Sequence, residues 1–225
     1  KVVSDGGLPD ESGLDGTTDY LYSGVQCMEE RNPFGGEEED VDTPVRQYVW
    51  GLYVDELVQQ KDIDGEAATD YYLLSDLLYR SVALTDTTPA IQEAYDTDAY
   101  GNTLAFSGPG NDGNWFTDDD LNIDNDPNRA WPLCRFGFTG RSHDYETGIY
   151  FYRARYYQQV LGRFLSRDPA DYLQDPNLYC YASGDPTVGA DPSGLLWEVE
   201  RNWLRPQALA KAEHDNVKNL AKKIG

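Results

Sequence analysis

The chain has 225 residues and a formal net charge of −22, yet aromatic residues make up 13% of it. Acidic disordered chains are normally poor in aromatics, so the composition indicates a packed structure. A charge of this sign excludes nucleic acid and anionic membranes as expected partners, because phosphate binding requires a basic surface.

Residues 1–44 are expected to form an acidic repeat fragment or linker. The first seven residues lack the apolar core of a secretory signal, and no window approaches the roughly 20 apolar residues of a membrane span. The chain also starts at Lys1 rather than at Met. We therefore expect a piece of a longer polypeptide, without a membrane span.

Short strand-like runs alternate with Gly, Asp, Asn and Pro clusters through residues 45–135, which is typical of an all-β chain with many hairpins. Tyrosine, present 17 times, suits strands because its ring can be half-buried while its hydroxyl reaches water or a partner. The clearest runs are 47–50 with 52–54, 71–74, 81–85, 94–95 and 148–157.

Two acidic stretches, 36–42 and 108–132, interrupt this pattern and are expected to be solvated loops. Carboxylates at alternating positions also suit calcium. An EF-hand is disfavoured, because counting from Asp120 gives no glycine at the sixth position and Trp131 at the twelfth. A looser calcium loop, for example around residues 62–65, stays open, and no other cofactor is expected.

The three cysteines, Cys27, Cys134 and Cys180, have no metal-like spacing, and the sequence contains only two histidines. No zinc site is expected. Two alternatives remain: one disulfide with a single thiol, or three reduced cysteines.

Residues 138–157 predict a turn followed by a strand. Gly148 supplies the turn conformation that other residues resist. Residues 149–157 are expected to form one strand, with side chains that alternate between two faces. One face would carry Tyr150, Tyr152, Ala154 and Tyr156, and the other Ile149, Phe151, Arg153, Arg155 and Tyr157.

Residues 136–195 closely resemble the RHS-repeat-associated core, the terminal module of RHS and YD-repeat proteins. The resemblance is firm there and looser over residues 45–135, where Tyr48–Gly51 and Tyr95–Asp96 resemble YD-repeat strands. The matching elements, in order, are Tyr145–Tyr150, Arg153–Tyr157, Leu161–Leu165, Asp168–Pro169, Asn177–Tyr179, Tyr181 and Asp191–Leu195.

The resemblance implies a sheet of YD-repeat β-hairpins wound into part of a hollow shell, which this module closes and which can enclose a C-terminal effector such as a toxin. It also implies an aspartyl autoprotease that cuts its own chain between Leu195 and Leu196. Two carboxylates that share a site can divide the acid and base roles. Asp168 and Asp191 match the catalytic positions, and Arg167 matches an assisting cation. Asp185 is an additional carboxylate that could compete for the second place.

Residues 196–225 carry six basic and four acidic side chains, so the rest of the chain holds a charge of −24. A short amphipathic helix is expected there, starting near Pro206. Thirty residues are too few for most independent catalytic domains.

Two functions therefore stay open: a secreted or cell-surface shell-closing module that releases an effector by self-cleavage, or a non-cleaving structural or adhesive surface protein. The expected partners are the rest of its own shell and an enclosed effector. For the adhesive alternative they are further copies of the chain or a surface glycan.

Overall fold

The computed structural model describes residues 2–3, 16–32, 43–88, 90–126, 131–170, 176–195 and 198–199. These residues form β-strands and short 3-10 turns, with no α-helix in the described ranges, so the all-β prediction is confirmed. The helix expected within 196–225 lies outside them. None of the described segments is a helix long and apolar enough to cross a membrane.

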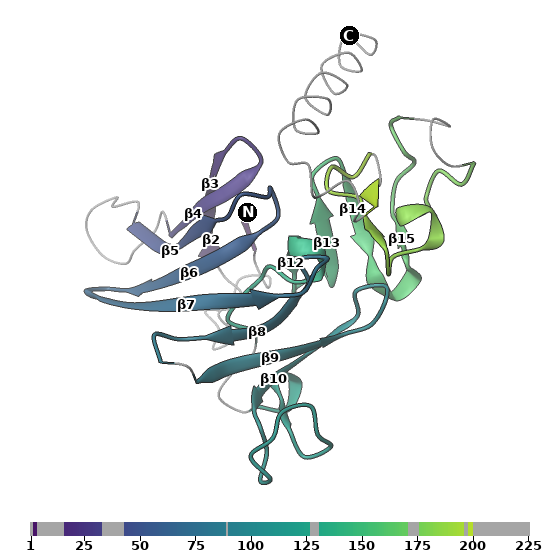
Figure 1. Cartoon of the computed structure of the whole chain (residues 1–225). Coiled ribbons are helices and arrows are strands. Elements are labelled where there is room, and N and C mark those ends of the chain that lie inside the picture. The colour runs from purple at the N-terminus through teal and green to yellow at the C-terminus, as the bar shows by residue number, and fades with distance from the viewer. Residues whose placement is uncertain are drawn as a thin grey trace. The chain divides into compact units, whose positions relative to one another are not determined.

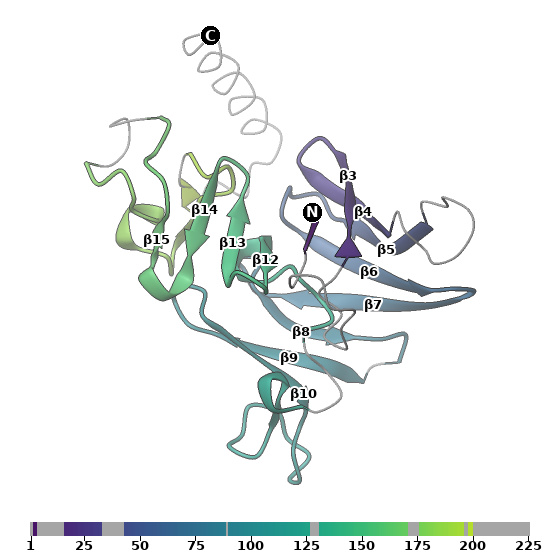
Figure 2. The ribbon, with the colours of Figure 1, turned by 180° about the vertical axis from the view of Figure 1, so that it is seen from behind.

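The chain divides into two compact units, Lys1–Leu73 with Thr85–Ala90, and Leu74–Leu84 with Ile91–Gly225. Figure 1 and Figure 2 draw the strands from opposite sides. In the first unit, neighbours pair antiparallel in chain order. The strands are β3 (Asp19–Ser23), β4 (Gln26–Asn32), β5 (Thr43–Trp50), β6 (Leu57–Asp64) and β7 (Ala67–Ser75), and a further short pair joins β1 (Val2–Val3) to β2 (Gly16–Thr17).

An ionic ladder crosses three strands of this unit. Arg46 lies opposite Glu30 on one side and Asp62 on the other. Its guanidinium Nε donates to Asp62 at 2.6 Å, and its Nη1 lies 3.8 Å from Glu30. Directly opposed charges of opposite sign stabilise antiparallel pairs and fix their register. The ladder explains how strands with so many carboxylates pack side by side.

The second unit begins with strands β8 (Ser81–Thr85), β9 (Ile91–Thr97), β10 (Thr103–Gly108) and β11 (Leu121–Asn122), which are neighbours in that order. Between β10 and β11 lies an exposed loop, within the stretch expected to be solvated. Its carboxylates close the loop on itself, since Asp119 accepts from the amide of Asn111 and Asp120 from that of Phe116.

A second sheet in this unit contains β12 (Ser142–Asp144), β13 (Ile149–Tyr152), β14 (Arg155–Gln158) and β15 (Arg163–Phe164). One of its faces builds the main core, in which ring centroids of neighbouring aromatics lie 4.6 to 6.2 Å apart. Such pairs contribute about 0.5–1.5 kcal/mol each beyond area burial. The core residues are Phe138, Tyr150, Tyr152, Tyr157, Phe164, Tyr181 and Ala182.

The predicted continuous strand over 149–157 is wrong. Arg153 has a φ of +58°, which turns the chain back and separates β13 from β14. The turn restarts the alternation of side chains, so Tyr157 shares the buried face with Tyr150 and Tyr152. Tyr156, predicted on that face, points outward and is half-exposed.

Two short strands, β16 (Gly189–Ala190) and β17 (Glu198–Val199), pair antiparallel close to the end of the described chain. The connection between these two strands begins at Asp191, and its described part ends at Leu195, the residue before the predicted scissile bond.

Candidate functional site

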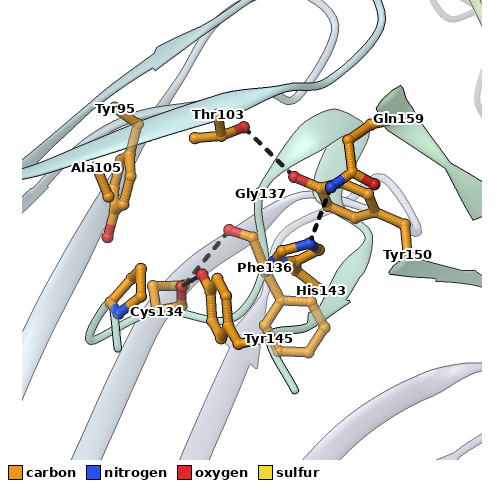
Figure 3. Close-up of a pocket in the computed structure, with 11 residues that line it drawn as sticks. Tyr95, Thr103, Ala105, Cys134, Phe136, Gly137, His143, Tyr145, Tyr150 and Gln159 are labelled. Atoms are coloured by element: carbon orange, nitrogen blue, oxygen red, sulfur yellow. Dashed lines mark hydrogen bonds between the residues drawn. The ribbon is translucent and has the colours of Figure 1, made fainter. Parts of the chain in front are cut away.

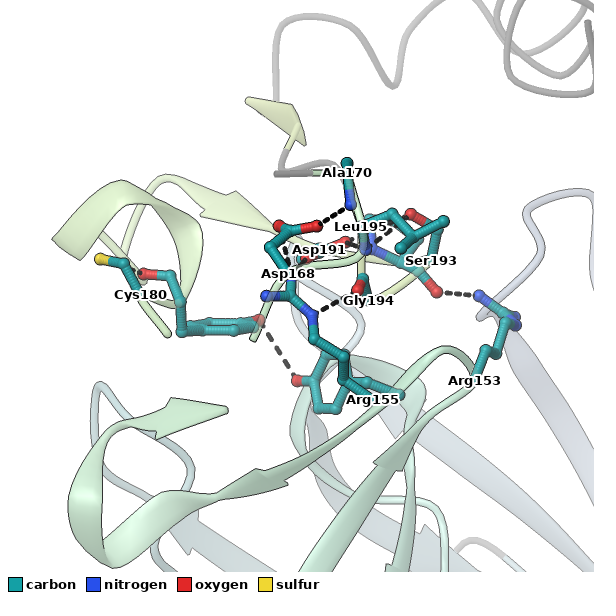
Figure 4. Close-up of polar contacts among 12 residues, drawn as sticks. Arg153, Arg155, Asp168, Ala170, Cys180, Asp191, Ser193, Gly194 and Leu195 are labelled. Atoms are coloured by element: carbon teal, nitrogen blue, oxygen red, sulfur yellow. Dashed lines mark hydrogen bonds and ion pairs between the residues drawn. The ribbon is translucent and has the colours of Figure 1, made fainter. Parts of the chain in front are cut away.

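Arg155, the first residue of β14, lies at the centre of a buried polar cluster in the second unit (Figure 4). Its side chain is 2% exposed. One nitrogen, Nη2, lies 2.9 Å from the Oδ2 atom of Asp191 and 3.1 Å from that of Asp168. A single guanidinium nitrogen thus joins two carboxylates that are 23 positions apart in the sequence.

The rest of the guanidinium binds backbone. Its Nε donates to the carbonyl of Gly194, and Nη1 donates to the carbonyl of Leu178 at 3.3 Å. The ring of Phe164 lies 3.6 Å below the guanidinium carbon. A cation held over an aromatic face and against carboxylates is favourable where water is excluded.

Asp191 uses its other oxygen to fix the chain that follows it. Oδ1 accepts from the backbone amide of Leu195 at 3.0 Å and from the hydroxyl of Ser193 at 3.3 Å. The side chain is 3% exposed. Asp191 therefore ties the amide of Leu195, the residue before the predicted scissile bond, to the Arg155 cluster.

Asp168 is the more exposed carboxylate, at 16% of its side chain. Oδ1 accepts from the amide of Ala170 at 2.7 Å, while its own backbone amide donates to Leu178 at 2.9 Å. These bonds fix the Asp-Pro turn that brings the carboxylate to Arg155. The residual exposure gives Asp168 the access to solvent that Asp191 lacks.

Two further arginines, Arg141 and Arg153, hold the same segment. Both donate to the carbonyl of Pro192, Arg141 at 3.4 Å. Gly194 has a φ of +69°, and a Cβ there would lie 2.2 Å from the carbonyl oxygen of Tyr152. The segment thus presses against the β13–β14 turn more closely than any other residue type would allow.

Burial lowers the pKa of Arg155, whereas the charges of Asp191 and Asp168 raise it. The burial effect is the larger of the two. A buried cation that pays for desolvation is retained only where carboxylates compensate it. The positive charge of Arg155 is therefore stabilised in this buried position by both aspartates.

Of the residues singled out from the sequence, Asp168, Asp191 and Leu195 lie together. Arg167 is exposed, and the cation that contacts both carboxylates is Arg155. Asp185 is exposed and accepts from the hydroxyl of Thr187 at 2.8 Å. Leu196 lies outside the described residues.

Sequence reasoning missed the role of Arg155. The available signal was its position in a strand of aromatic residues, because an arginine that is buried there requires carboxylate partners.

The remaining metal and thiol candidates add no second site within the described ranges. No group of three or more His, Cys, Asp or Glu side chains is placed there to hold a metal ion. The three cysteines, all in described parts of the chain, form no disulfide in the structure.

Known proteins share sequence with this chain. The toxin protein Tse5 of Pseudomonas aeruginosa is 46% identical over 59 residues, which is 26% of this chain and 4% of Tse5. The tRNA nuclease WapA of Bacillus subtilis is 32% identical over 124 residues, 52% of this chain and 4% of WapA. YibJ of Escherichia coli is 32% identical over 147 residues, 65% of this chain and 54% of YibJ. The chain thus spans a small part of Tse5 and of WapA and about half of YibJ.

Among solved structures, TcdB2-TccC3 without its hypervariable C-terminal region aligns with 84% of this chain and 9% of its own length, at a TM-score of 0.47 and 22% identity. No family model matches the chain. The sequence relatives define the class: the chain is homologous to the RHS/YD-repeat proteins, as its motifs predicted.

Proposed function

We propose that this segment closes the C-terminal end of an RHS shell and cuts its own chain between Leu195 and Leu196. The observation that carries the proposal is the cluster in which Arg155 binds both Asp168 and Asp191 while Asp191 binds the amide of Leu195. A carboxylate close to a peptide bond can take a proton from an attacking water and pass it to the leaving nitrogen, which is the proton transfer that hydrolysis requires.

Asp168 and Asp191 differ in exposure and in their hydrogen bonds, which suits them to different roles in the reaction. Asp191 is buried and accepts from the amide of Leu195, so it orients the peptide that precedes the scissile one. Asp168 is the carboxylate with access to solvent, and it takes a proton from the attacking water. Water oxygen bonds to the Leu195 carbonyl carbon, the bond to the Leu196 nitrogen breaks, and that nitrogen receives the proton.

Arg155 positions the reacting segment. Its contact with the carbonyl of Gly194 fixes the peptide before the scissile one, and its shared Nη2 holds the two carboxylates at one place. The β16–β17 pair, which flanks the bond on both sides, supports this role by restraining the ends of the connection. Holding a bond near its catalytic groups is a large part of intramolecular rate acceleration.

The test is the intact mass of the freshly made chain at neutral pH. We expect a fragment that begins at Leu196, and we expect Asp168→Asn or Asp191→Asn to abolish it. Asp185→Asn is the matched control, since Asp185 also precedes a proline but is exposed and bound to Thr187. Neutral pH matters because Asp-Pro bonds break in acid without an enzyme. An uncut unsubstituted chain, or equal cutting in all variants, would contradict the proposal.

The alternative is a structural or adhesive surface module in which the same cluster only locks the turn after β16. The full use of Asp191 oxygens by Arg155, Ser193 and Leu195 favours it, because such bonds stabilise a fold whether or not cleavage occurs. In that case an uncut protein would assemble into larger particles or bind a surface glycan, and Asp168→Asn would leave both unchanged.

The expected partners follow from the relatives. Tse5 is named a toxin protein and WapA a tRNA nuclease, and a mosquito relative is named salivary gland surface protein 1. By analogy, this segment would associate with the remainder of its own shell, enclose or release a C-terminal effector, and act outside the cell or at its surface. Co-purification of the cut tail with the shell would support that arrangement.

A further inference from the structure

One face of β10 in the second unit is apolar and exposed. Thr103 and Ala105 line a cavity together with Tyr95 of β9, as Figure 3 shows. Side chains alternate along a strand, so Leu104 and Phe106 lie on the face of β10 that points away from this cavity. Leu104 is half-exposed there.

Two residues that follow β10 extend this face. The ring of Phe116 packs edge to face on that of Phe106, with centroids 6.3 Å apart, and is itself half-exposed. A Cβ added to Gly108, two positions after Phe106, would lie 3.9 Å from the Cβ of Leu121, which places the exposed Leu121 on the same face. Leu104, Phe106, Phe116 and Leu121 are called the β10 patch below. Contiguous exposed apolar side chains of this kind mark a site of interaction.

The surroundings of the β10 patch are acidic. Residues 91–126 contain nine Asp and Glu residues and no Lys, Arg or His. Asp96, which is exposed, lies opposite Leu104, and Asp120 accepts from the amide of Phe116 at 2.6 Å. An occupant of the patch must therefore combine apolar side chains with positive charge, because the carboxylates around it attract cations and repel anions.

A second exposed apolar face, on the sheet of β12–β15, has arginines beside it. Tyr156 packs on Phe151 with ring centroids 5.6 Å apart, and the amide of Leu165 donates to the carbonyl of Tyr156. Tyr156 and Leu165 are half-exposed. Arg163 and Arg167, each two positions from Leu165, are exposed. A cationic segment is therefore favoured at the β10 patch over this second face.

Residues 216–225 of the same chain have the required chemistry. The segment contains three lysines and no Asp or Glu, together with apolar residues spaced as one face of the helix expected in this tail. The lysines are Lys218, Lys222 and Lys223, and the apolar residues are Val217, Leu220 and Ile224.

The chain between β17 and this segment is long enough to reach the β10 patch. β17 ends at Val199 and pairs with β16 in the second unit. The roughly 17 residues that follow can span up to about 55 Å when extended. A unit of this size is about 40 Å across.

We propose that residues 216–225 dock on the β10 patch of their own chain. Their apolar side chains cover Leu104, Phe116 and Leu121, and their lysines lie beside Asp96 and the carboxylates of the β10–β11 loop. Covalent attachment raises the effective concentration of the segment, so a contact that is weak between separate molecules forms within one chain. The β10 patch thus restrains the tail on the second unit.

Photo-crosslinking in the full chain tests this docking. The photoreactive residue p-benzoylphenylalanine replaces Phe116, and cross-linked peptides are identified by mass spectrometry after irradiation. We expect links from position 116 to residues 216–225, in about tenfold higher yield than from the same group at position 156. Tyr156 is the matched control because it is an aromatic residue with similar exposure on the second face. If the freshly made chain is cut, Asp168→Asn keeps it intact, so the result does not depend on the proposed cleavage.

The charge of the segment is tested separately. Combined Lys218→Glu, Lys222→Glu and Lys223→Glu changes are expected to lower the yield from position 116 about tenfold, because three attractions become repulsions. The corresponding three Lys→Arg changes are expected to retain it. Raising the ionic strength from about 0.05 M to about 0.5 M is expected to lower the yield of the unsubstituted tail, since salt screens exposed charges.

A mixture of nitrogen-15-labelled and unlabelled chains separates the chain's own tail from that of a second copy. Cross-links within chains of one label support the proposal. Cross-links that join labelled to unlabelled chains, equal yields from positions 116 and 156, or no link from position 116 to residues 216–225 would overturn it.

Discussion

Gly194 lies at the tightest point of the candidate site. Its positive φ is a conformation that L-residues adopt at a cost of about 1–2 kcal/mol. The space is also closed, because an added Cβ would meet the backbone oxygen of Tyr152 at 2.2 Å. The atoms that the Cβ would meet belong to the backbone of Tyr152 and Arg155, which cannot move aside as a flexible side chain would. The conformation of the Asp191–Leu195 segment therefore depends on this glycine.

Gly194→Ala is therefore expected to destabilise the second unit by about 3 kcal/mol, combining φ strain with displacement of the segment. Gly184→Ala is the control, since Gly184 has a φ of +81° but open space around its Cβ position. It is expected to cost only the strain, about 1 kcal/mol. Urea unfolding measures the free energy of unfolding of both variants. An equal loss of stability in Gly194→Ala and Gly184→Ala would contradict the close contact at Gly194.

His143 makes stability depend on pH. Burial lowers its pKa from 6.5 to about 4, so in the range between these values the unfolded chain binds a proton that the folded chain does not. The contribution of neutral His143 to the free energy of unfolding is thus complete above about pH 6.5 and is lost as the pH falls toward 4. The loss is at most about 3 kcal/mol.

Unfolding at pH 7 and at about pH 4.5 measures this dependence, with His143→Gln as the control. The variant is expected to lose the part of the pH dependence that His143 causes. An NMR titration that gives His143 an ordinary pKa would contradict the expectation.

The two aspartates of the site could be proposed from the sequence, but only through their resemblance to a family motif. As residues, Asp168 and Asp191 resemble ordinary Asp-Pro turns, and nothing in their spacing states that they meet. Arg155 was hidden for another reason: alternation in a continuous strand would have placed it with Tyr157, without indicating a carboxylate partner.

At the scale of elements, the β13–β14 hairpin connects the aromatic core to the site. Tyr152 in β13 and Tyr157 in β14 contribute to the core, whereas Arg155 in β14 reaches the carboxylates. The hydroxyl of Tyr152 lies 2.7 Å from that of Thr139 and donates to Tyr181 at 3.2 Å. The core thus contains a chain of hydroxyls that positions the hairpin.

Tyr152→Phe is expected to cost about 1–2 kcal/mol, because it leaves the buried hydroxyls of Thr139 and Tyr181 without this partner. Tyr156→Phe, at a half-exposed position on the other face, is expected to change stability by less than about 0.5 kcal/mol. Denaturant midpoints compare the two. A similar loss in both would argue against the hydroxyl chain.

The strands themselves could be predicted, because β-branched and aromatic runs between turn residues mark them. The predicted runs at 47–50, 71–74 and 81–85 all lie in strands. The hairpin at Arg153 could not be predicted from the sequence, because its turn lacks Gly, Asn or Pro and carries an arginine at positive φ. The contact of Arg153 with the Pro192 carbonyl compensates for that conformation, and it comes from residues distant in sequence.

At the scale of the whole molecule, the chain is homologous to RHS/YD-repeat proteins, and the Arg155 cluster carries the reaction proposed for it. Both carboxylates, the arginine and the segment before the bond belong to the second unit, so the proposed chemistry requires no residue of the first. Cleavage would separate the 30 residues that follow Leu195 from a strand-rich body.

The most direct measurement is the mass of the cleavage products when the chain is synthesised at neutral pH in water enriched in oxygen-18. The account predicts a body that ends at Leu195 and carries one heavy oxygen in its new carboxyl group, together with a tail that begins at Leu196 and gains no heavy oxygen from the cleavage. An intact chain, a cut at another bond, or a body without the label would contradict hydrolysis at this site.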